Sequence, residues 1–188
     1  MSSVLELLAE NPIIAAVKDE SQLEDALSSK CDILFFLFGT ICNISKLVDQ
    51  AKKAGKTVFV HMDLTNGLSS KEIAADFIRK TTAADGVIST RPSLLRHAKA
   101  LGLLTVLRVF IVDSLALANL KKQLDSCNAD LVEIMPGVMP SIISRISSEI
   151  SVPIITGGLI FDKKDIISAL SAGAQCISTT CENIWNEM

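Results

Sequence analysis

The sequence predicts a compact α/β protein, a (β/α)8 barrel of the TIM type that forms a single domain over residues 1–188. Short apolar runs alternate with longer stretches of helical periodicity, which is typical of βα units around a parallel sheet. We count about eight runs of each kind, the number that such a barrel has. The runs are apolar and rich in β-branched residues, as expected for strands that are buried on both faces.

The predicted strands follow from these apolar runs and from the turn residues that bound them. In chain order they are Ile13 to Val17, Asp32 to Phe38, Thr57 to Met62, Gly86 to Ser89, Thr105 to Ile111, Leu131 to Met135, Pro153 to Thr156 and Cys176 to Thr179.

Start and stop signals mark the helices between these strands. Ser69 with Glu72 has the spacing of a capping box, Asp113 and Asp162 suit N-caps, and Pro140 suits a first helical turn. Glycines that end helical patterns predict left-handed C-caps. They are Gly55, Gly102 and Gly173. Leu117, Leu120 and Leu124 share one helical face, which we expect to pack on the sheet.

The rival topology is an open doubly wound sheet, which normally has a glycine-rich loop after its first strand. Here that position reads "AAVKDESQ", which favours the barrel. Because barrels of this class typically need about 250 residues, this chain has little length for insertions. Its function must therefore be built from short loops.

Composition and charge argue against some classes of function, such as general polyanion binding and secretion. With a net charge of −3 and a pI of about 5.4, the protein as a whole does not attract a polyanion such as a nucleic acid. The N-terminus lacks the cationic start of a secretory signal, and the run from Ile33 to Phe38 is too short to span a membrane, so we expect a cytoplasmic protein without a membrane partner. The five scattered cysteines, without a CxxC pair, predict buried thiols and no disulfide framework or metal site.

Two adjacent glycines, Gly157 and Gly158, follow the seventh strand and precede the helix that begins near Asp162. The missing Cβ atoms let backbone N–H groups approach a ligand, and a helix N-terminus favours anions. Barrels of this class often hold a phosphate after strands seven and eight. We therefore predict a phosphate site there, with Ser178, Thr179 and Thr180 as further donors. The alternative is that the glycines only make a tight turn.

Other polar residues interrupt the apolar runs where strands end. Lys18 and Arg108 place positive charge near the predicted phosphate; alternatively, each forms an ion pair with Glu133 or Asp63. Glu133 is placed to accept hydrogen bonds from a polyol, with an ion-pair role as its alternative.

His61 and Asp63, in the segment "HMD", are predicted to lie on one side of an extended chain and to contact a ligand or pair with each other. Arg91, Arg96 and Lys99, around the helix after strand four, are the best local surface for RNA, although a solvated helix face explains them as well. No nucleophile or metal-ligand motif stands out, so no catalytic residue, metal or cofactor is predicted.

Several motifs recur in order from about Pro12 to Trp185: "HMDL", "ISTR", "RVFIVD", "EIMPGVMP" and "GGLI". In these motifs the chain resembles the glycerol-3-phosphate-responsive antiterminators, regulators of glycerol uptake operons. Cys181 stands where the family pattern has a serine after its threonines, which removes one hydroxyl from the predicted phosphate site.

The resemblance implies a barrel that is not an enzyme. It implies binding of glycerol 3-phosphate as an effector and then binding and stabilisation of the leader mRNA of a glycerol-metabolism operon, so that transcription passes a terminator. The family motifs fall on residues already singled out and on one N-cap: His61, Asp63, Arg91, Arg108, Asp113, Glu133, Gly157, Gly158, Thr179 and Thr180.

Two other functions stay open at this point. A barrel enzyme acting on a small phosphorylated polyol or sugar would use Asp63 or Glu133 as general base and Lys18 as electrophile. A ligand sensor that acts only on protein partners is the third possibility. Assembly into a homo-oligomer is compatible with all three functions.

Overall fold

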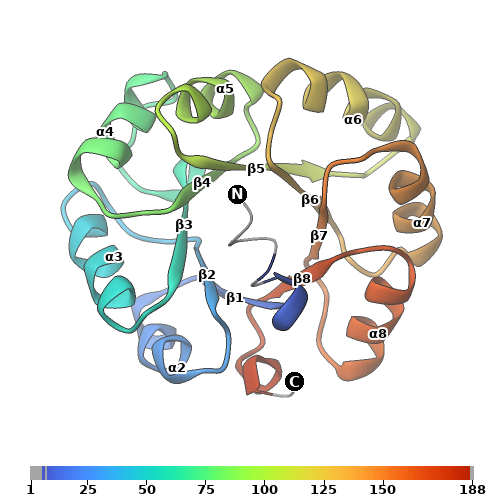
Figure 1. Ribbon diagram of the computed structural model, residues 1–188, viewed down its shortest axis with the longest axis horizontal. Coiled ribbons are helices and arrows are strands. Elements are labelled where there is room, and N and C mark those ends of the chain that lie inside the picture. The colour runs from blue at the N-terminus through green and yellow to red at the C-terminus, as the bar shows by residue number, and fades with distance from the viewer. Residues whose placement is uncertain (1–5, 7, 187–188) are drawn as a thin grey trace.

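The computed structural model describes residues 6 and 8–186, and it confirms the predicted barrel. Eight parallel strands close in the order β1-β2-β3-β4-β5-β6-β7-β8, and the helices form a ring outside them (Figure 1). The strands are β1 (Ile13–Val17), β2 (Ile33–Phe36), β3 (Thr57–His61), β4 (Gly86–Ser89), β5 (Leu104–Phe110), β6 (Leu131–Met135), β7 (Ile154–Gly157) and β8 (Cys176–Thr179).

Helices of the described chain connect these strands on the outside. They are η1 (Glu20–Gln22), α2 (Leu23–Ser28), α3 (Ile44–Lys53), η2 (Met62–Leu64), α4 (Ile73–Thr81), α5 (Pro92–Ala100), α6 (Ser114–Cys127), α7 (Pro140–Glu149), α8 (Lys163–Ser171) and η3 (Glu182–Asn186). The unit after β8 ends in the short 3-10 helix η3. Its Trp185 is buried and donates an indole hydrogen bond to Thr179 O at 2.9 Å.

Most of the predicted caps are confirmed. Asp113 accepts from Ala116 N at 2.7 Å, and Asp162 accepts from Asp165 N at 2.9 Å. The three glycines predicted as left-handed C-caps have φ of +79°, +80° and +107°. Pro140 opens α7. Leu120 and Leu124 of α6 are buried, and Leu117 packs against the same core.

The predicted capping box at Ser69 is wrong. Glu72 is itself the N-cap position of α4, and Ser69 Oγ accepts from Lys71 N within the loop. The helix starts later than predicted because η2 and an irregular segment come first. The same 3-10 turn begins at Met62, so the expectation that His61 and Asp63 share an extended chain is also wrong.

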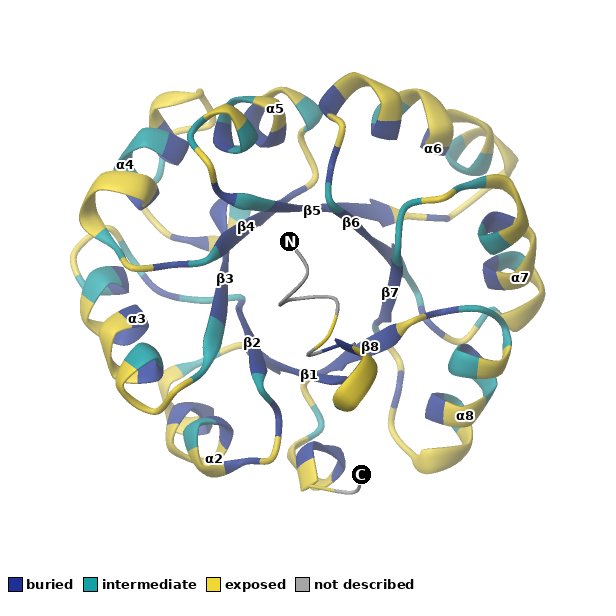
Figure 2. Ribbon diagram, viewed as in Figure 1, coloured by how far each residue is buried: buried dark blue, intermediate teal, exposed yellow. Residues whose placement is uncertain are grey.

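Two apolar clusters hold the barrel together, one on each side of the strands. Figure 2 shows that most strand residues are buried, as are residues on the helix faces that point toward the strands. The outer cluster lies between the strands and the inward faces of the helices. The inner cluster fills the amino-terminal half of the barrel, where Leu8 joins it and the Phe35 and Phe59 rings pack edge to face at 5.5 Å. This interior is a packed core, so any ligand must bind nearer the carboxyl ends of the strands.

The cysteines are all free. Cys31, Cys127 and Cys176 are buried as predicted, whereas Cys42 is exposed and Cys181 is half-buried. Burial raises the pKa of the Cys31 thiol to about 11, and burial also raises the pKa of Cys176. These thiols are therefore poor nucleophiles at neutral pH. No helix among the described residues is long and apolar enough to cross a membrane.

Candidate functional site

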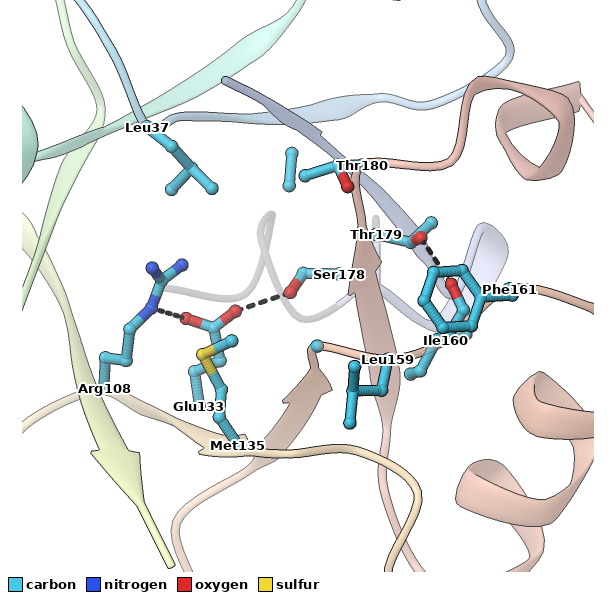
Figure 3. Close-up of a pocket in the computed structure, with 12 residues that line it drawn as sticks. Leu37, Arg108, Glu133, Met135, Leu159, Ile160, Phe161, Ser178, Thr179 and Thr180 are labelled. Carbon is cyan, nitrogen blue, oxygen red and sulfur yellow. Dashed lines mark hydrogen bonds and ion pairs between the residues drawn. The ribbon is translucent and has the colours of Figure 1, made fainter.

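A pocket of about 80 Å³ with mostly apolar walls lies at the carboxyl ends of β5 to β8, where Ala16 of β1 and Leu37 after β2 also line it (Figure 3). Strand ends and the loops after β7 and β8 form its walls. Its polar lining residues are Arg108, Glu133, Ser178, Thr179 and Thr180, and its other lining residues are Ala16, Leu37, Met135, Gly158, Leu159, Ile160 and Phe161. This is the end at which barrels of this type place their functional groups.

A buried ion pair forms the polar floor of the pocket. Arg108 Nε donates to Glu133 Oε2 at 2.6 Å, and Ser178 Oγ donates to Glu133 Oε1 (Figure 3). The side chain of Glu133 is fully buried and that of Arg108 is 6% exposed. Because the Glu133 carboxylate is shielded from water, it needs hydrogen bonds from both Arg108 and Ser178: a buried charge without partners costs several kcal/mol. Arg108 and Glu133 are register partners on the neighbouring strands β5 and β6, and Ser178 reaches Glu133 from β8 across Gly157 of β7.

Gly157 has no side chain because Glu133 and Ser178 occupy its space. A Cβ atom at this position would overlap Ser178 Oγ and lie 2.8 Å from Glu133 Oε1. The sequence suggested that the glycine gives a ligand access to the backbone. In the structure, the missing side chain of Gly157 instead leaves room for the hydrogen bond between the Ser178 hydroxyl and the Glu133 carboxylate.

Gly158 and Leu159 both have left-handed backbone conformations, with φ of +77° and +61°. A leucine in this region is strained by roughly 1–2 kcal/mol. The N–H groups of Gly158, Leu159 and Thr180 donate to no group among the residues that the structure describes. Unpaired N–H groups beside a pocket suit an anionic ligand.

The loop after β7 is fixed at its far end by α8. Asp165 Oδ2 accepts from Phe161 N at 3.0 Å, while Asp162 caps the helix. Thr179 Oγ1 donates to Ile160 O at 2.9 Å and accepts from Cys181 N at 3.1 Å. The Thr179 hydroxyl therefore holds the loop in place, whereas Thr180 is exposed at the pocket.

His61 ends β3 on the inside of the barrel, where its side chain is only 2% exposed. Burial and the positive charge of Arg108 lower its pKa to about 3, although Asp63 opposes the shift. The imidazole is therefore neutral at pH 7. Its Nδ1 atom has no hydrogen-bond partner among the described residues, so it is available to a ligand hydroxyl or to water.

Asp63 does not line the pocket. Its carboxylate accepts hydrogen bonds from Ser89 Oγ at 3.0 Å and from Thr90 N at 2.7 Å, and Arg91 Nε lies 3.8 Å away. These contacts join η2 to the loop after β4. The sequence singled out Asp63, but it did not reveal that Ser89 and Thr90 are its hydrogen-bond partners.

The remaining predicted residues are dispersed. Lys18 is exposed and does not line the pocket, so the structure does not bring it to Arg108. Arg91 precedes α5, Arg96 lies in its middle, and Lys99 lies in its last turn, where it pairs with Asp130 at 2.9 Å. Arg96 and Lys99 lie about one turn apart on the same helix, so the RNA-binding surface proposed for these residues stays a prediction.

Sequence reasoning missed the apolar walls of the pocket, Leu37, Met135, Leu159 and Phe161. The signal that the sequence offered was two large apolar residues, Leu159 and Phe161, in the loop directly after the glycine pair. Thr156 near the end of β7 is buried, with its Oγ1 unpaired among the described residues. No group of three or more metal-binding side chains occurs within residues 6 and 8–186.

The fold and the pocket define a small (β/α)8 barrel with a pocket at the carboxyl ends of its last four strands, floored by Arg108, Glu133 and Ser178. The chain belongs to the glycerol-3-phosphate responsive antiterminator family, whose pattern matches residues 13–185.

Relatives of known sequence or structure agree with this assignment. The chain is 43% identical over 182 residues to the uncharacterized protein YgcP of Escherichia coli K12, covering 97% of this chain and 95% of that protein. It is 28% identical to the crystal structure of the glycerol uptake operon antiterminator regulatory protein of Listeria monocytogenes, with a TM-score of 0.91 and coverage of 95% and 96%. A glycerol uptake operon antiterminator-related protein of Thermotoga maritima is 33% identical, with a TM-score of 0.81 and coverage of 92% and 96%.

Enzymes share the fold at greater distance. The deoxyribose phosphate aldolase of Aeropyrum pernix matches with a TM-score of 0.68 at 18% identity, covering 98% of this chain and 91% of that chain. At this identity the likeness concerns the fold alone.

Proposed function

We propose that this protein is a cytoplasmic antiterminator that binds glycerol 3-phosphate in the β5–β8 pocket and then binds the leader mRNA of a glycerol-metabolism operon. Family membership supports the class of regulator. The observation that carries the ligand assignment is a polar floor of Arg108, Glu133 and Ser178 beside the unpaired N–H groups of Gly158 and Leu159.

In this proposal the two ends of the ligand meet different chemistry. The phosphate lies against the N–H groups of the β7 and β8 loops, where the dipole of α8 adds positive potential. The hydroxyls lie against Glu133 and Ser178, whereas His61 does not line the pocket. Arg108 is shared between Glu133 and the ligand, which makes its charge available to the phosphate without leaving Glu133 unpaired.

Ligand binding acts on the RNA-binding state by differential affinity. Phe161 lines the pocket and is also 68% exposed, and Leu159 is 56% exposed. A ligand beneath this loop would therefore change an exposed surface as well as the pocket. Such a change is sufficient for regulation if RNA favours one arrangement of the protein.

A barrel enzyme remains the alternative function, but two of the residues proposed for it, Lys18 and Asp63, no longer fit their roles. Lys18 does not line the pocket and thus is not placed as an electrophile. Asp63 does not line the pocket either, which leaves Glu133 as the candidate base there.

The test is a gel shift with a leader hairpin from a glycerol operon at one fixed salt concentration, with and without glycerol 3-phosphate. Glycerol and inorganic phosphate serve as control ligands. The proposal predicts retardation of the RNA that depends on glycerol 3-phosphate. Absence of retardation by folded protein, or conversion of the ligand during incubation, would favour a protein-partner sensor or an enzyme.

A further inference from the structure

Large apolar side chains are exposed almost entirely at the pocket end of the barrel. Ten such side chains are exposed among the described residues. Nine of them lie at the carboxyl end of a strand, in the segment after it or in the first turn of the next helix, and the tenth, Ile167, lies within α8. Scattered apolar residues are normal on a surface, but a one-sided concentration marks an interaction site.

Six of the nine belong to three consecutive strand-to-helix connections, those after β5, β6 and β7. We name these six side chains the β5–β7 rim: Phe110, Val112, Leu115, Val138, Leu159 and Phe161. Backbone hydrogen bonds join the three connections, since Ile111 N donates to Met135 O at 2.8 Å and Gly137 N donates to Gly158 O at 3.0 Å. A Cβ atom at Gly137 would lie 2.8 Å from Ile160 Cδ1, so the second and third connections are packed against each other. The six side chains therefore stand on adjoining loops.

The rim carries few charges, and both signs are present. Residues 135–140 contain no charged side chain. The other two segments, 110–116 and 158–165, together contain three carboxylates and two ammonium groups: Asp113, Asp162, Asp165, Lys163 and Lys164. This balance does not attract a polyanion. An apolar, aromatic-containing surface with few charges is instead typical of the centre of a protein–protein interface.

The apolar area of the rim is close to what a stable dimer needs. The exposed fractions of its six side chains run from 40% for Val138 to 80% for Val112. With roughly 150–250 Å² for a fully exposed large side chain, these fractions correspond to roughly 500–900 Å². A specific protein–protein interface buries about 800 Å² on each partner. Contact through this rim alone is therefore sufficient for a specific dimer.

The charges of the rim allow it to pair with itself. Copies of one chain associate most often through a twofold axis, which places a surface against the same surface of the partner. Apolar side chains then meet apolar side chains. Lys163 and Lys164 are exposed and pair with no described residue, so they are free to meet carboxylates of the second copy.

Two members of the rim, Leu159 and Phe161, also line the pocket (Figure 3). A second copy seated on the rim would lie next to the pocket and contact the same loop that the bound ligand contacts. A ligand that changes the stability of the dimer must have its own affinity changed by the dimer by the same factor. Occupancy of the pocket and association of the chains are thus linked through one loop.

We infer that the β5–β7 rim is the interface between two copies of this chain, and that glycerol 3-phosphate in the pocket stabilises the dimer. The identity of the ligand rests on the proposed function, whereas the interface does not. RNA would then contact another surface of the dimer.

A matched pair of variants tests the inference. Val112→Lys/Val138→Lys adds two charges to the rim, and neither residue lines the pocket. Ile73→Lys/Ile167→Lys adds the same charge at two exposed apolar positions outside the rim. Sedimentation equilibrium measures the dimer dissociation constant of the wild type and of both variants, with and without glycerol 3-phosphate. Circular dichroism verifies that each variant is folded.

We expect the rim variant to raise the dimer dissociation constant at least about tenfold, because four buried lysines would replace apolar contacts in the dimer. The control variant should stay within about twofold of the wild type. Glycerol 3-phosphate should lower the dissociation constant of the wild type at least about fivefold. The rim variant should bind the ligand more weakly by a similar factor, although its altered residues do not line the pocket.

A wild type that stays monomeric at the highest protein concentration measured, with ligand present, would overturn the interface. If the rim variant of such a monomer lost RNA binding, the rim would belong to RNA instead. A rim variant that dimerises as well as the control would overturn the rim as the interface and leave the proposed function intact.

The link to the ligand is tested separately. If glycerol 3-phosphate binds but leaves the dimer dissociation constant unchanged, the link is wrong and the interface stands. If calorimetry detects no binding of glycerol 3-phosphate while the rim variant still loses the dimer, the proposed function fails and the interface stands.

Discussion

The two halves of the barrel interior differ in what fills them. The amino-terminal half contains apolar side chains such as Phe35, Phe59 and Ile155, in contact with one another. The carboxyl-terminal half contains polar side chains. Arg108 and Ser178 donate hydrogen bonds to Glu133, and His61 Nδ1 has no partner among the described residues. Along the barrel axis, the amino-terminal half of the interior therefore provides the apolar core, and the carboxyl-terminal half provides the polar groups of the proposed ligand site.

The largest effect should come from breaking the buried ion pair. Arg108→Met leaves the fully buried Glu133 carboxylate with only Ser178 as a partner. We expect a loss of about 3–5 kcal/mol in the free energy of unfolding, together with the loss of ligand binding. Urea denaturation and calorimetric titration measure the two effects.

The double variant Arg108→Met/Glu133→Gln is the control for this prediction, because it removes both charges. It should recover at least half of the lost stability without recovering ligand affinity. An Arg108→Met protein within about 1 kcal/mol of the wild type would show that the pair is not buried as described.

A comparable loss of stability should follow from Phe59→Ala in the apolar half. This change removes the edge-to-face contact with Phe35 and leaves a cavity, at a cost of about 3–5 kcal/mol. Ligand affinity of the folded fraction should stay within about twofold. A large loss of affinity in this variant would mean that the two halves are not independent.

His61 should make stability depend on pH. Its folded pKa of about 3 lies below the ordinary value of 6.5, so the unfolded chain binds a proton that the folded protein excludes. Stability is therefore complete above pH 6.5 and falls as the pH drops toward 3, with a loss of about 2 kcal/mol between pH 7 and pH 5. Denaturant midpoints of the wild type and of His61→Asn across this range should diverge at low pH. If the midpoints of the two proteins fell in parallel as the pH dropped, His61 would not be the cause of the pH dependence.

The smallest effects concern the helix caps. Asp113→Ala and Asp162→Ala each remove one side-chain cap, and each should cost about 1 kcal/mol. Only Asp162 lies beside the loop that carries Phe161, so only Asp162→Ala should also weaken ligand binding. Thermal melts and titrations of both variants compare the two sites, and equal ligand affinities would show that the loop is fixed without its helix cap.

The sequence was sufficient to predict the barrel because strand burial, turn residues and caps are local signals. Asp113 and Asp162 cap helices as predicted. The start of α4 was misplaced because Ser69 uses its hydroxyl to accept from Lys71 N within the loop, and the helix begins only after Glu72.

The site was predictable as a set of strand-end residues but not as a set of contacts. Glu133 with Arg108 was foreseen as an alternative, and the structure shows this pair. The reason for Gly157 could not be foreseen, since it depends on side chains that reach it from β6 and β8. The pairing of Asp63 with Ser89 and Thr90 likewise depends on how two loops meet in space.

The most direct test of the account is a calorimetric titration of glycerol 3-phosphate into the wild type and into Glu133→Gln, with inorganic phosphate and glycerol as reference ligands. The account predicts one site in the wild type, with glycerol 3-phosphate bound at least about tenfold more tightly than either reference. It also predicts clearly weaker binding by folded Glu133→Gln, because the buried carboxylate accepts hydrogen bonds from the ligand hydroxyls. A wild type without binding, or a Glu133→Gln protein with unchanged affinity, would contradict the assignment of the pocket.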